Sequence, residues 1–201
     1  MSDFQHETNA ELPAVGAPTE PKYAGFWRRV AAHFIDGVVM SLTMLAIVLV
    51  TIGNNSLYLL TLIVPGVLSI IYQLYFTTQY GASLGKMAMG IKIVRLDGGP
   101  IGFSQANLRY LPFLIFAVVG ILGNVEAFQN IPIPSIFFEY GWTERAKILQ
   151  QQQPIWILFN SLISGLFIVA DTIALLISKQ KLSIHDRIAN TMVIKIETTT
   201  D

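Results

Sequence analysis

The sequence predicts an all-α membrane protein with four transmembrane helices, both termini in the cytoplasm, and a small cytoplasmic two-stranded element. Hydrophobic residues make up 53% of the chain and charged residues only 13%, well below the roughly 25% charged residues of soluble domains. Four apolar stretches approach or exceed the roughly 20 residues that a spanning helix needs. Of the 13 basic residues, all but Arg145 and Lys147 lie in segments assigned to one side, which the positive-inside rule makes the cytoplasm.

The N-terminal segment, residues 1–22, is acidic and proline-rich with few large apolar side chains, which predicts a disordered cytoplasmic tail. It has no basic start followed by an apolar core, so we expect the first hydrophobic helix to remain as an anchor. The membrane domain is expected to cover residues 23–195, and residues 196–201 form a C-terminal tail.

The four helices are expected at residues 26–52, 57–79, 109–125 and 154–178. A turn cluster at residues 53–56 joins the first two. The third is expected to be the shortest, with Pro112 in its first turn, a position that proline favours. The segment between the third and fourth helices, residues 126–153, is rich in aromatic side chains, which predicts an external loop lying along the membrane surface.

Two short segments on the cytoplasmic side have the alternating pattern of half-buried strands. Residues 91–96 alternate and stop at a strong turn signal, and residues 192–196 form a similar run near the C-terminus. Isolated strands leave their backbone groups unpaired, so we expect these two to pair. Before the second, Ser183 and Asp186 form a capping box that opens a short helix, which Asn190 closes.

The first helix carries polar groups into its apolar run. Arg29, His33 and Asp36 are spaced to lie on one helix face, and an ionisable group inside a membrane is a functional hypothesis by default. Each also has a structural interpretation. Arg29 can be an interfacial anchor, and His33 a hydrogen-bonding neighbour rather than a metal ligand. Asp36 can be a structural partner of Arg29, of Arg109 or of a polar group on the third helix.

A second acid lies at a matching depth in the fourth helix. Asp36 is seven residues inside Arg29 and Asp171 is eight residues inside Lys179. At the helical rise per residue, both carboxylates lie about 10 to 12 Å below the same edge. If the two helices are neighbours, the acids can meet and share a proton.

The sequence offers little support for an enzyme or a cofactor. Residues 81–86 read GASLGK, but the glycine spacing is one residue short of a phosphate-binding loop and Met87 stands where a serine or threonine binds magnesium. No nucleophile with a base and no metal-binding cluster is evident. We therefore expect no enzymatic activity, no cofactor, no metal and no nucleic-acid partner.

Three blocks of the sequence resemble the RDD family of bacterial membrane proteins. They read GFWRRVAAHFID at 25–36, SLGKMAMGIKIVRLDGGP at 83–100 and LSIHDRIANTMVI at 182–194. The resemblance assigns the family's arginine to Arg29, its first aspartate to Asp36, and its second to Asp186 or, less directly, Asp171. Asn190 stands where the family usually has glycine, and residues 126–153 have no counterpart. The resemblance implies a bacterial cytoplasmic (inner) membrane protein of a largely uncharacterised family that is linked to transport and, in some members, to sodium/proton antiport.

Two functions follow as expectations. The first is a transporter, such as a cation/proton antiporter, whose ion or proton site contains Asp36, Asp171, Arg29 and His33, and whose cytoplasmic gate contains Arg109, His185, Asp186 and Lys86. The alternative is a non-transporting adaptor that binds a partner or anionic lipid through its basic cytoplasmic loop and tail. Four helices are few for alternating access, so we expect a homo-oligomer or another membrane protein as partner, besides lipid and a monovalent cation or proton.

Overall fold

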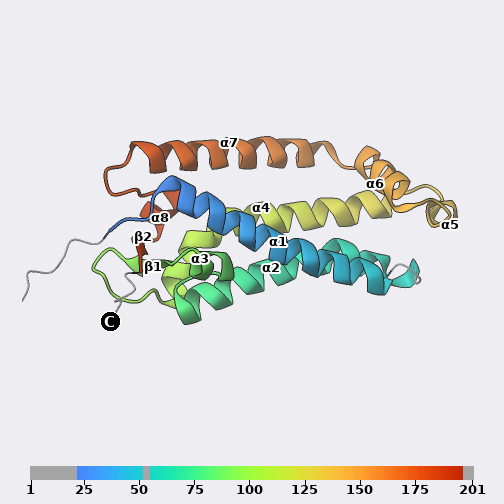
Figure 1. The fold of residues 1–201 in the computed structure, drawn as a ribbon. Coiled ribbons are helices and arrows are strands. Elements are labelled where there is room, and N and C mark those ends of the chain that lie inside the picture. Colours follow the sequence, from blue (N-terminus) through green and yellow to red (C-terminus); the bar gives the residue numbers. More distant parts are fainter. Residues whose placement is uncertain (1–21, 52–54, 197–201) are drawn as a thin grey trace, which may run out of the picture.

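The computed structural model describes residues 22–51 and 55–196. Four long helices make up an elongated bundle, with small elements gathered at its two ends (Figure 1). The long helices are α1 (Phe26–Thr51), α2 (Tyr58–Tyr80, preceded by the 3-10 turn η1, Asn55–Leu57), α4 (Phe103–Gln129) and α7 (Ile155–Ile177). The predicted tail at residues 1–22 lies almost wholly outside the described residues, and so does nearly all of the C-terminal tail, 196–201.

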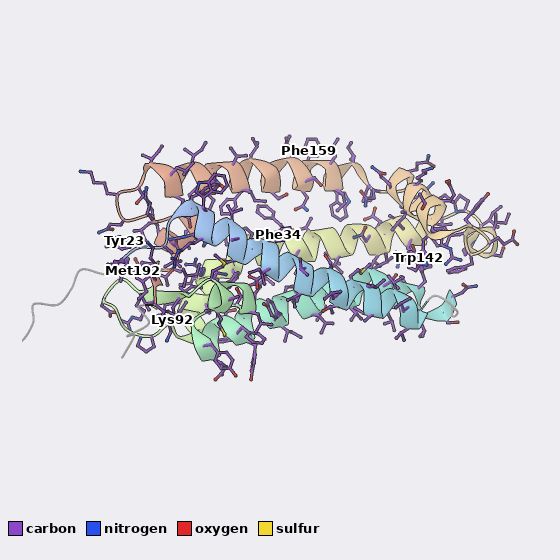
Figure 2. The ribbon with its side chains drawn as sticks, viewed as in Figure 1. Tyr23, Phe34, Lys92, Trp142, Phe159 and Met192 are labelled. Atoms are coloured by element: carbon purple, nitrogen blue, oxygen red, sulfur yellow. The ribbon has the colours of Figure 1, made fainter. Side chains whose placement is uncertain are left out.

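All four long helices have the length and apolar composition of membrane spans, which confirms the predicted number. Large apolar side chains project from their outer surfaces: Leu42 is 62% exposed on α1, Leu122 57% on α4 and Phe159 57% on α7. Figure 2 shows Phe159 on the outer side of α7. A continuous surface of this kind is unfavourable in water and suits the hydrocarbon interior of a bilayer.

Helix α4 differs most from the prediction, because it spans 27 residues and is not the shortest helix. It begins at Phe103, where the Gln105 side chain accepts a hydrogen bond from the Gly102 amide at 3.2 Å. Pro112 therefore lies inside the helix rather than in its first turn. The polar first turns resemble a loop in sequence, but they pack onto the sheet through the fully buried Ala106.

The segment expected as an external loop contains α5 (Pro134–Phe137) and α6 (Trp142–Gln151). Its aromatic side chains do not simply lie along a surface. They pack on Tyr58 of α2 in a buried cluster with Phe128, Phe137, Phe138 and Trp142. The cluster caps the end of the bundle opposite the sheet (Figure 1).

The predicted strand pair is present. Strand β1 (Ile91–Arg95) runs antiparallel to β2 (Thr191–Lys195), with Ile93 opposite Val193. One face of the sheet is fully buried against Ala24, Ala32 and Ala106, so the sheet is joined to α1 and α4. Both described chain ends meet here, since the Lys195 amide donates to the Lys22 carbonyl at 2.8 Å.

Two short helices complete this end of the molecule, α3 (Leu84–Ala88) and α8 (Ile184–Ile188). The sequence predicted α8 with its capping box, and the structure confirms both. Asn190, which follows α8, has a φ of 52°. Asparagine tolerates this left-handed conformation better than other residues except glycine, so asparagine suits this position. Helix α3 was not predicted.

Candidate functional site at the junction of helices and sheet

The centre of the site is the buried carboxylate of Asp186 on α8, which lies between two arginines. Its Oδ2 accepts a hydrogen bond from Arg29 Nη1 of α1 at 2.7 Å, and its Oδ1 accepts one from Arg109 Nη1 of α4. Arg29 also donates to the Lys181 carbonyl at 2.6 Å, and Arg109 to Thr191 Oγ1 at 2.7 Å. The cluster therefore connects α1, α4, α8 and β2.

Local sequence places Asp186 in this position. As third residue of the capping box, its carboxylate accepts a hydrogen bond from the Ser183 amide at 3.1 Å, while Ser183 Oγ caps α8. Burial acts to raise the pKa of Asp186, but Arg109, His185 and Arg29 together hold it well below its usual range. Asp186 is therefore ionised at neutral pH, as a carboxylate paired with two guanidinium groups should be.

Asp36 forms a separate junction between α1 and α3. Its carboxylate accepts hydrogen bonds from Tyr72 Oη at 2.7 Å, Ser83 Oγ at 2.6 Å and the Gly85 amide at 2.8 Å. Ser83 is also the N-cap of α3. A Cβ at Gly85 would lie 2.9 Å from Asp36 Oδ1 and would collide with the Ala32 carbonyl. Only glycine allows α3 to approach α1 closely enough for these bonds.

Asp171 of α7 pairs with His185 of α8. Its Oδ1 accepts hydrogen bonds from the His185 amide at 3.1 Å and is 2.8 Å from His185 Nδ1. Burial and the positive charge of Arg109 lower the pKa of His185, although both neighbouring carboxylates favour its charged form. The imidazole is therefore neutral at neutral pH, and a ring that keeps its hydrogen on Nδ1 donates it to Asp171.

Ionisable side chains from α1, α3, α4, α7 and α8 surround a cavity of about 310 Å³, which we call the ionisable cavity. Six predicted site residues line it: Arg29, His33, Lys86, Arg109, Asp171 and His185. Apolar side chains of α1, α4 and α7 complete its wall. Lys86 is only 4% exposed, and its Nζ donates to Ser83 Oγ at 3.2 Å. Ser83 thus links the cavity to Asp36, which does not line it.

Two expected contacts are wrong. Arg29 pairs with Asp186 and not with Asp36 on its own helix. Asp36 and Asp171 do not form a shared-proton pair, because Asp36 bonds to α2 and α3 whereas Asp171 bonds to α8. The physical reason is that equal depth in the membrane says nothing about the direction in which each carboxylate faces. The short helices α3 and α8 place hydrogen-bond donors closer to each carboxylate than the other carboxylate is.

The structure adds residues that sequence reasoning did not assign to the site. Tyr72 and Ser83 bind Asp36, and Thr191 binds Arg109. A serine before a short apolar run signals a helix N-cap, so Ser83 was detectable. Tyr72 and Thr191 act through contacts between distant segments and carried no such signal.

Among the described residues, no group of three or more histidine, cysteine, aspartate or glutamate side chains could hold a metal ion. The chemistry that the site can perform rests on its ionisable side chains and ion pairs. Ionisable side chains face a cavity, and a strong ion-pair cluster lies at one side of it.

Comparison with known proteins gives one family and one distant relative. A model of the RDD family matches residues 23–190. The uncharacterized protein YxaI of Bacillus subtilis (strain 168) is 25% identical over 127 residues, which cover 52% of this chain and 84% of that protein. No solved structure matches the chain.

Proposed function

The chain belongs to the RDD family, and from this premise we propose that it is a small membrane transporter that exchanges a proton for a monovalent cation. The observation that carries the proposal is the ionisable cavity, where Asp171, His185, His33 and Lys86 face one space beside the membrane spans. Ionisable groups inside a membrane are expensive to maintain and usually mark ion or proton pathways.

Asp171 is the best candidate for the exchanging carboxylate. Both hydrogen bonds from His185 end on its Oδ1, so among the described contacts Oδ2 is left to take a proton or a cation. Asp36, by contrast, accepts three hydrogen bonds on its two oxygens. We therefore assign Asp36 to the attachment of α3, and through Ser83 and Lys86 to the shape of the cavity.

The cluster of Arg29, Arg109 and Asp186 serves as the cytoplasmic gate in this proposal. It holds α8 and the sheet against α1 and α4, next to the cavity. Access from that side requires movement of α8, and such movement must separate buried ion pairs. Breaking a buried pair is costly, so the closed state is the resting state.

The direct test uses purified protein in liposomes that contain a pH-sensitive dye, challenged with sodium, lithium or potassium. Proton movement that depends on one of these cations, and that Asp171→Asn abolishes, would support exchange. Asp97→Asn is the matched control, since Asp97 is exposed and lies in a turn away from the cavity, where it pairs with Arg95 and accepts a hydrogen bond from the Gly99 amide. Liposomes of folded wild-type protein that show no cation-dependent proton movement would contradict the proposal.

A second candidate is a non-transporting adaptor, and the ion pairs that join the elements at the sheet end favour it. The buried charges of Arg29, Arg109 and Asp186 are fully paired, which suits a fixed platform as well as a gate. Exposed basic side chains, including Arg95 and Arg187, surround this platform. Inert liposomes together with a co-purifying membrane protein, or with retained anionic lipid, would favour the adaptor.

We also propose that both termini face the cytoplasm of a bacterial inner membrane and that the protein forms a homo-oligomer. The support for assembly is α7, whose large apolar side chains such as Leu162 and Leu166 are 57% and 62% exposed. Helix α7 packs mainly on α4 and α8, which leaves its outer face for lipid or a second copy. Mass measurement of the protein in native lipid particles tests this.

A further inference from the structure

Lys86 of α3 is a buried cation that has no carboxylate in direct contact. The residue is 4% exposed, lines the ionisable cavity, and donates to Ser83 Oγ at 3.2 Å. Tyr110 is its other polar neighbour. Lys86 takes part in none of the ion pairs between described residues, and Ser83 separates it from Asp36. Buried ammonium groups are rare unless they are paired, so Lys86 calls for an anionic ligand.

Arg109 supplies further donors to the same space. Both of its hydrogen bonds to described residues come from Nη1, which donates to Asp186 and Thr191. A guanidinium carries five N–H groups, so those on Nε and Nη2 remain for a ligand. Arg29 also lines the cavity, and Asp171 is the one acid of the described residues in this lining. The lining is therefore mainly cationic.

The wall of the cavity between α1 and α7 faces the outside of the bundle. Helix α1 packs on α2 and α3, and α7 packs on α4 and α8, but α1 and α7 do not pack closely on each other. Val30 of α1 and Ile168 of α7 line the cavity and are also 41% and 54% exposed on the outer surface. Side chains that belong to both surfaces mark a mouth, and in a membrane this mouth faces lipid.

The cavity also lies at the depth of the lipid headgroups. Its lining residues on α1, from Phe26 to His33, form the first turns of that helix, and Leu175 is close to the end of α7. The 26 residues of α1 cover about 39 Å at the helical rise, which exceeds the roughly 30 Å of the hydrocarbon core. Cationic side chains gather at the end that carries the cavity, which places that end in the headgroup region.

We propose that the ionisable cavity binds one anionic phospholipid, which enters between α1 and α7. Its phosphate accepts hydrogen bonds from Lys86 and Arg109, and the first carbons of an acyl chain pack on Val30 and Ile168. Arginine and lysine are the side chains that bind phosphate, and the apolar wall beside them selects a phosphate that carries a chain. The inference goes beyond the proposed exchange and does not depend on it.

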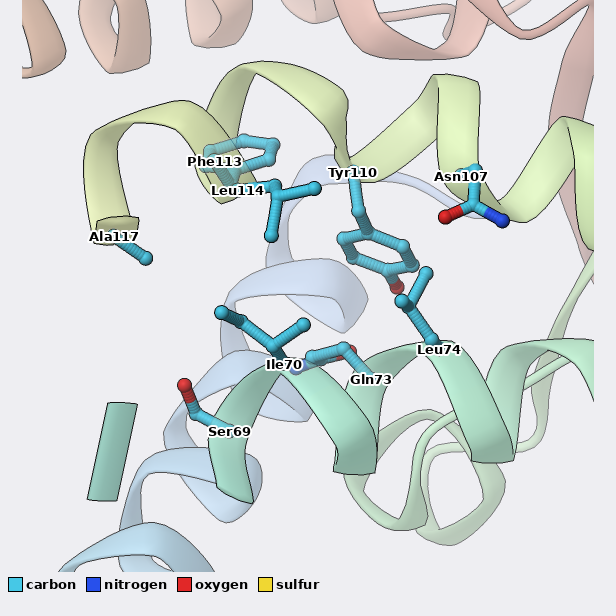
Figure 3. Close-up of a pocket in the computed structure, with 9 residues that line it drawn as sticks. All are labelled: Ser69, Ile70, Gln73, Leu74, Asn107, Tyr110, Phe113, Leu114 and Ala117. Atoms are coloured by element: carbon cyan, nitrogen blue, oxygen red, sulfur yellow. The ribbon is translucent and has the colours of Figure 1, made fainter. Parts of the chain in front are cut away.

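A second cavity, of about 190 Å³ between α2 and α4, offers a comparison within the molecule (Figure 3). Apolar side chains such as Ile70 and Leu114 line it, and none of the described residues in its lining is charged. This cavity has room for part of an acyl chain, but it has no cation that would select an anionic headgroup.

The first test measures lipid binding to the full chain by native mass spectrometry, with phosphatidylglycerol and phosphatidylethanolamine of identical acyl chains as probes. One phosphatidylglycerol should bind at least about fivefold more tightly than phosphatidylethanolamine, because one cation next to anionic lipid contributes about that factor. Lys86→Gln and Lys86→Met should each remove most of this preference. Lys179→Gln is the matched control, since Lys179 is exposed at the same end and outside the cavity lining.

Asp171→Asn separates this site from the exchange. Loss of the lining carboxylate should tighten the binding of phosphatidylglycerol, whereas the proposed exchanger loses proton movement in the same variant. Unchanged binding in Asp171→Asn, or in either folded Lys86 variant, would overturn the site, and so would an equal loss in Lys179→Gln. Displacement of the lipid by an equal concentration of glycerol phosphate would overturn the lipid assignment. Selective binding in a protein that moves no protons would retain the site and reject only the exchanger.

The second test locates the lipid by cross-linking. A phosphatidylglycerol with a photoreactive group on the acyl chain, close to the glycerol, should label the peptides that contain Val30 and Ile168. Excess unlabelled phosphatidylglycerol, but not phosphatidylethanolamine, should suppress this labelling, and Lys86→Gln should abolish the difference. Labelling near Ile70 and Leu114 in the second cavity should respond equally to both competitors. Headgroup-selective competition at the second cavity alone would overturn the site.

Discussion

Asp186 illustrates how one residue organises this protein. Its side chain is fully buried and is shared by Arg29 and Arg109. Two buried guanidinium groups next to each other repel, and the carboxylate between them offsets that repulsion. The same acid also completes the cap of α8. A single carboxylate therefore determines both a local helix and the contact among three elements.

We expect Asp186→Asn to destabilise the protein by about 3 to 5 kcal/mol, because it leaves two buried cations without a counter-charge. The measurement is thermal unfolding in detergent, followed by loss of the monodisperse species. Asp97→Asn provides the comparison. The Asp97 side chain is 57% exposed, and loss of a surface pair changes stability by no more than about 1 kcal/mol. Equal melting temperatures for Asp186→Asn and wild type would show that the cluster is not structural.

His185 should make the stability depend on pH. Its pKa in the folded protein is lowered by burial and by Arg109, from an unfolded value near 6.5. A proton that binds the unfolded chain more tightly favours unfolding, so stability is full above about pH 6.5 and falls as the pH drops below it. The ring faces Arg109, Asp171, Asp186, Phe113 and the Ser183 hydroxyl, which lies 3.0 Å from Nδ1. Melting temperatures at pH 7.5 and 5.5 should differ less in His185→Asn than in wild type.

At the scale of elements, α3 is held to α1 by Asp36 and by the absence of a side chain at Gly85. The bonds from Ser83 and the Gly85 amide satisfy groups at the start of α3, and a negative charge at that helix end is favourable. A helix of 5 residues has little stability of its own. Its position therefore depends on this contact.

Gly85→Ala should separate α3 from α1 and cost about 1 to 3 kcal/mol, as overpacking of a close contact does. Gly37→Ala is the control on α1, where an added Cβ has no atom within 4 Å. A glycine-to-alanine change inside a helix with free space stabilises it by up to about 1 kcal/mol. The two variants should thus shift the melting temperature in opposite directions. A neutral Gly85→Ala would mean that α3 is not packed as described.

The register of the sheet is tested by cysteine pairs. Ile93 faces Val193, so Ile93→Cys with Val193→Cys should form a disulfide under mild oxidation. Ile93→Cys with Ile194→Cys should not, because a shift of one residue moves the side chain to the other face of the sheet. Gel mobility after denaturation, with and without reductant, reads the result. Efficient cross-linking of the second pair instead would show a different register.

At the scale of the whole molecule, the bundle separates two ends of different character. The sheet, α3 and α8 form one end, and α5 and α6 form the other (Figure 1). The first end carries most of the basic residues. In a membrane, this uneven distribution of basic residues between the two ends sets the orientation of the protein.

We therefore expect a membrane-impermeant maleimide to label Lys147→Cys in intact bacterial cells and Arg95→Cys only after permeabilisation. Both side chains are exposed, at 62% and 47%, so differences in burial do not decide the outcome. Unmodified protein, which lacks cysteine, is the blank. The reverse labelling pattern would place the termini outside the cytoplasm.

Features that depend on local pattern can be predicted from the sequence. Apolar length alone sets the four spans, because each must satisfy its own backbone bonds in lipid. The strands at β1 and β2 and the cap at Ser183 follow from residues close to one another in the chain. Pairing of β1 with β2 was predictable because the chain offered no competing strand on that side.

The pairing of each acid with its partner follows from packing between distant segments and not from local sequence. Sequence spacing reports depth along a helix axis, and on that measure Asp36 and Asp171 look like a pair. The rotation of each long helix about its axis and the short helix packed beside it determine which partner each carboxylate meets. Asp36 therefore bonds to Ser83, and Asp171 to His185. The start of α4 and the ionisable cavity likewise depend on packing between distant segments. Such contacts form only when the whole chain folds, so no short stretch of sequence predicts them.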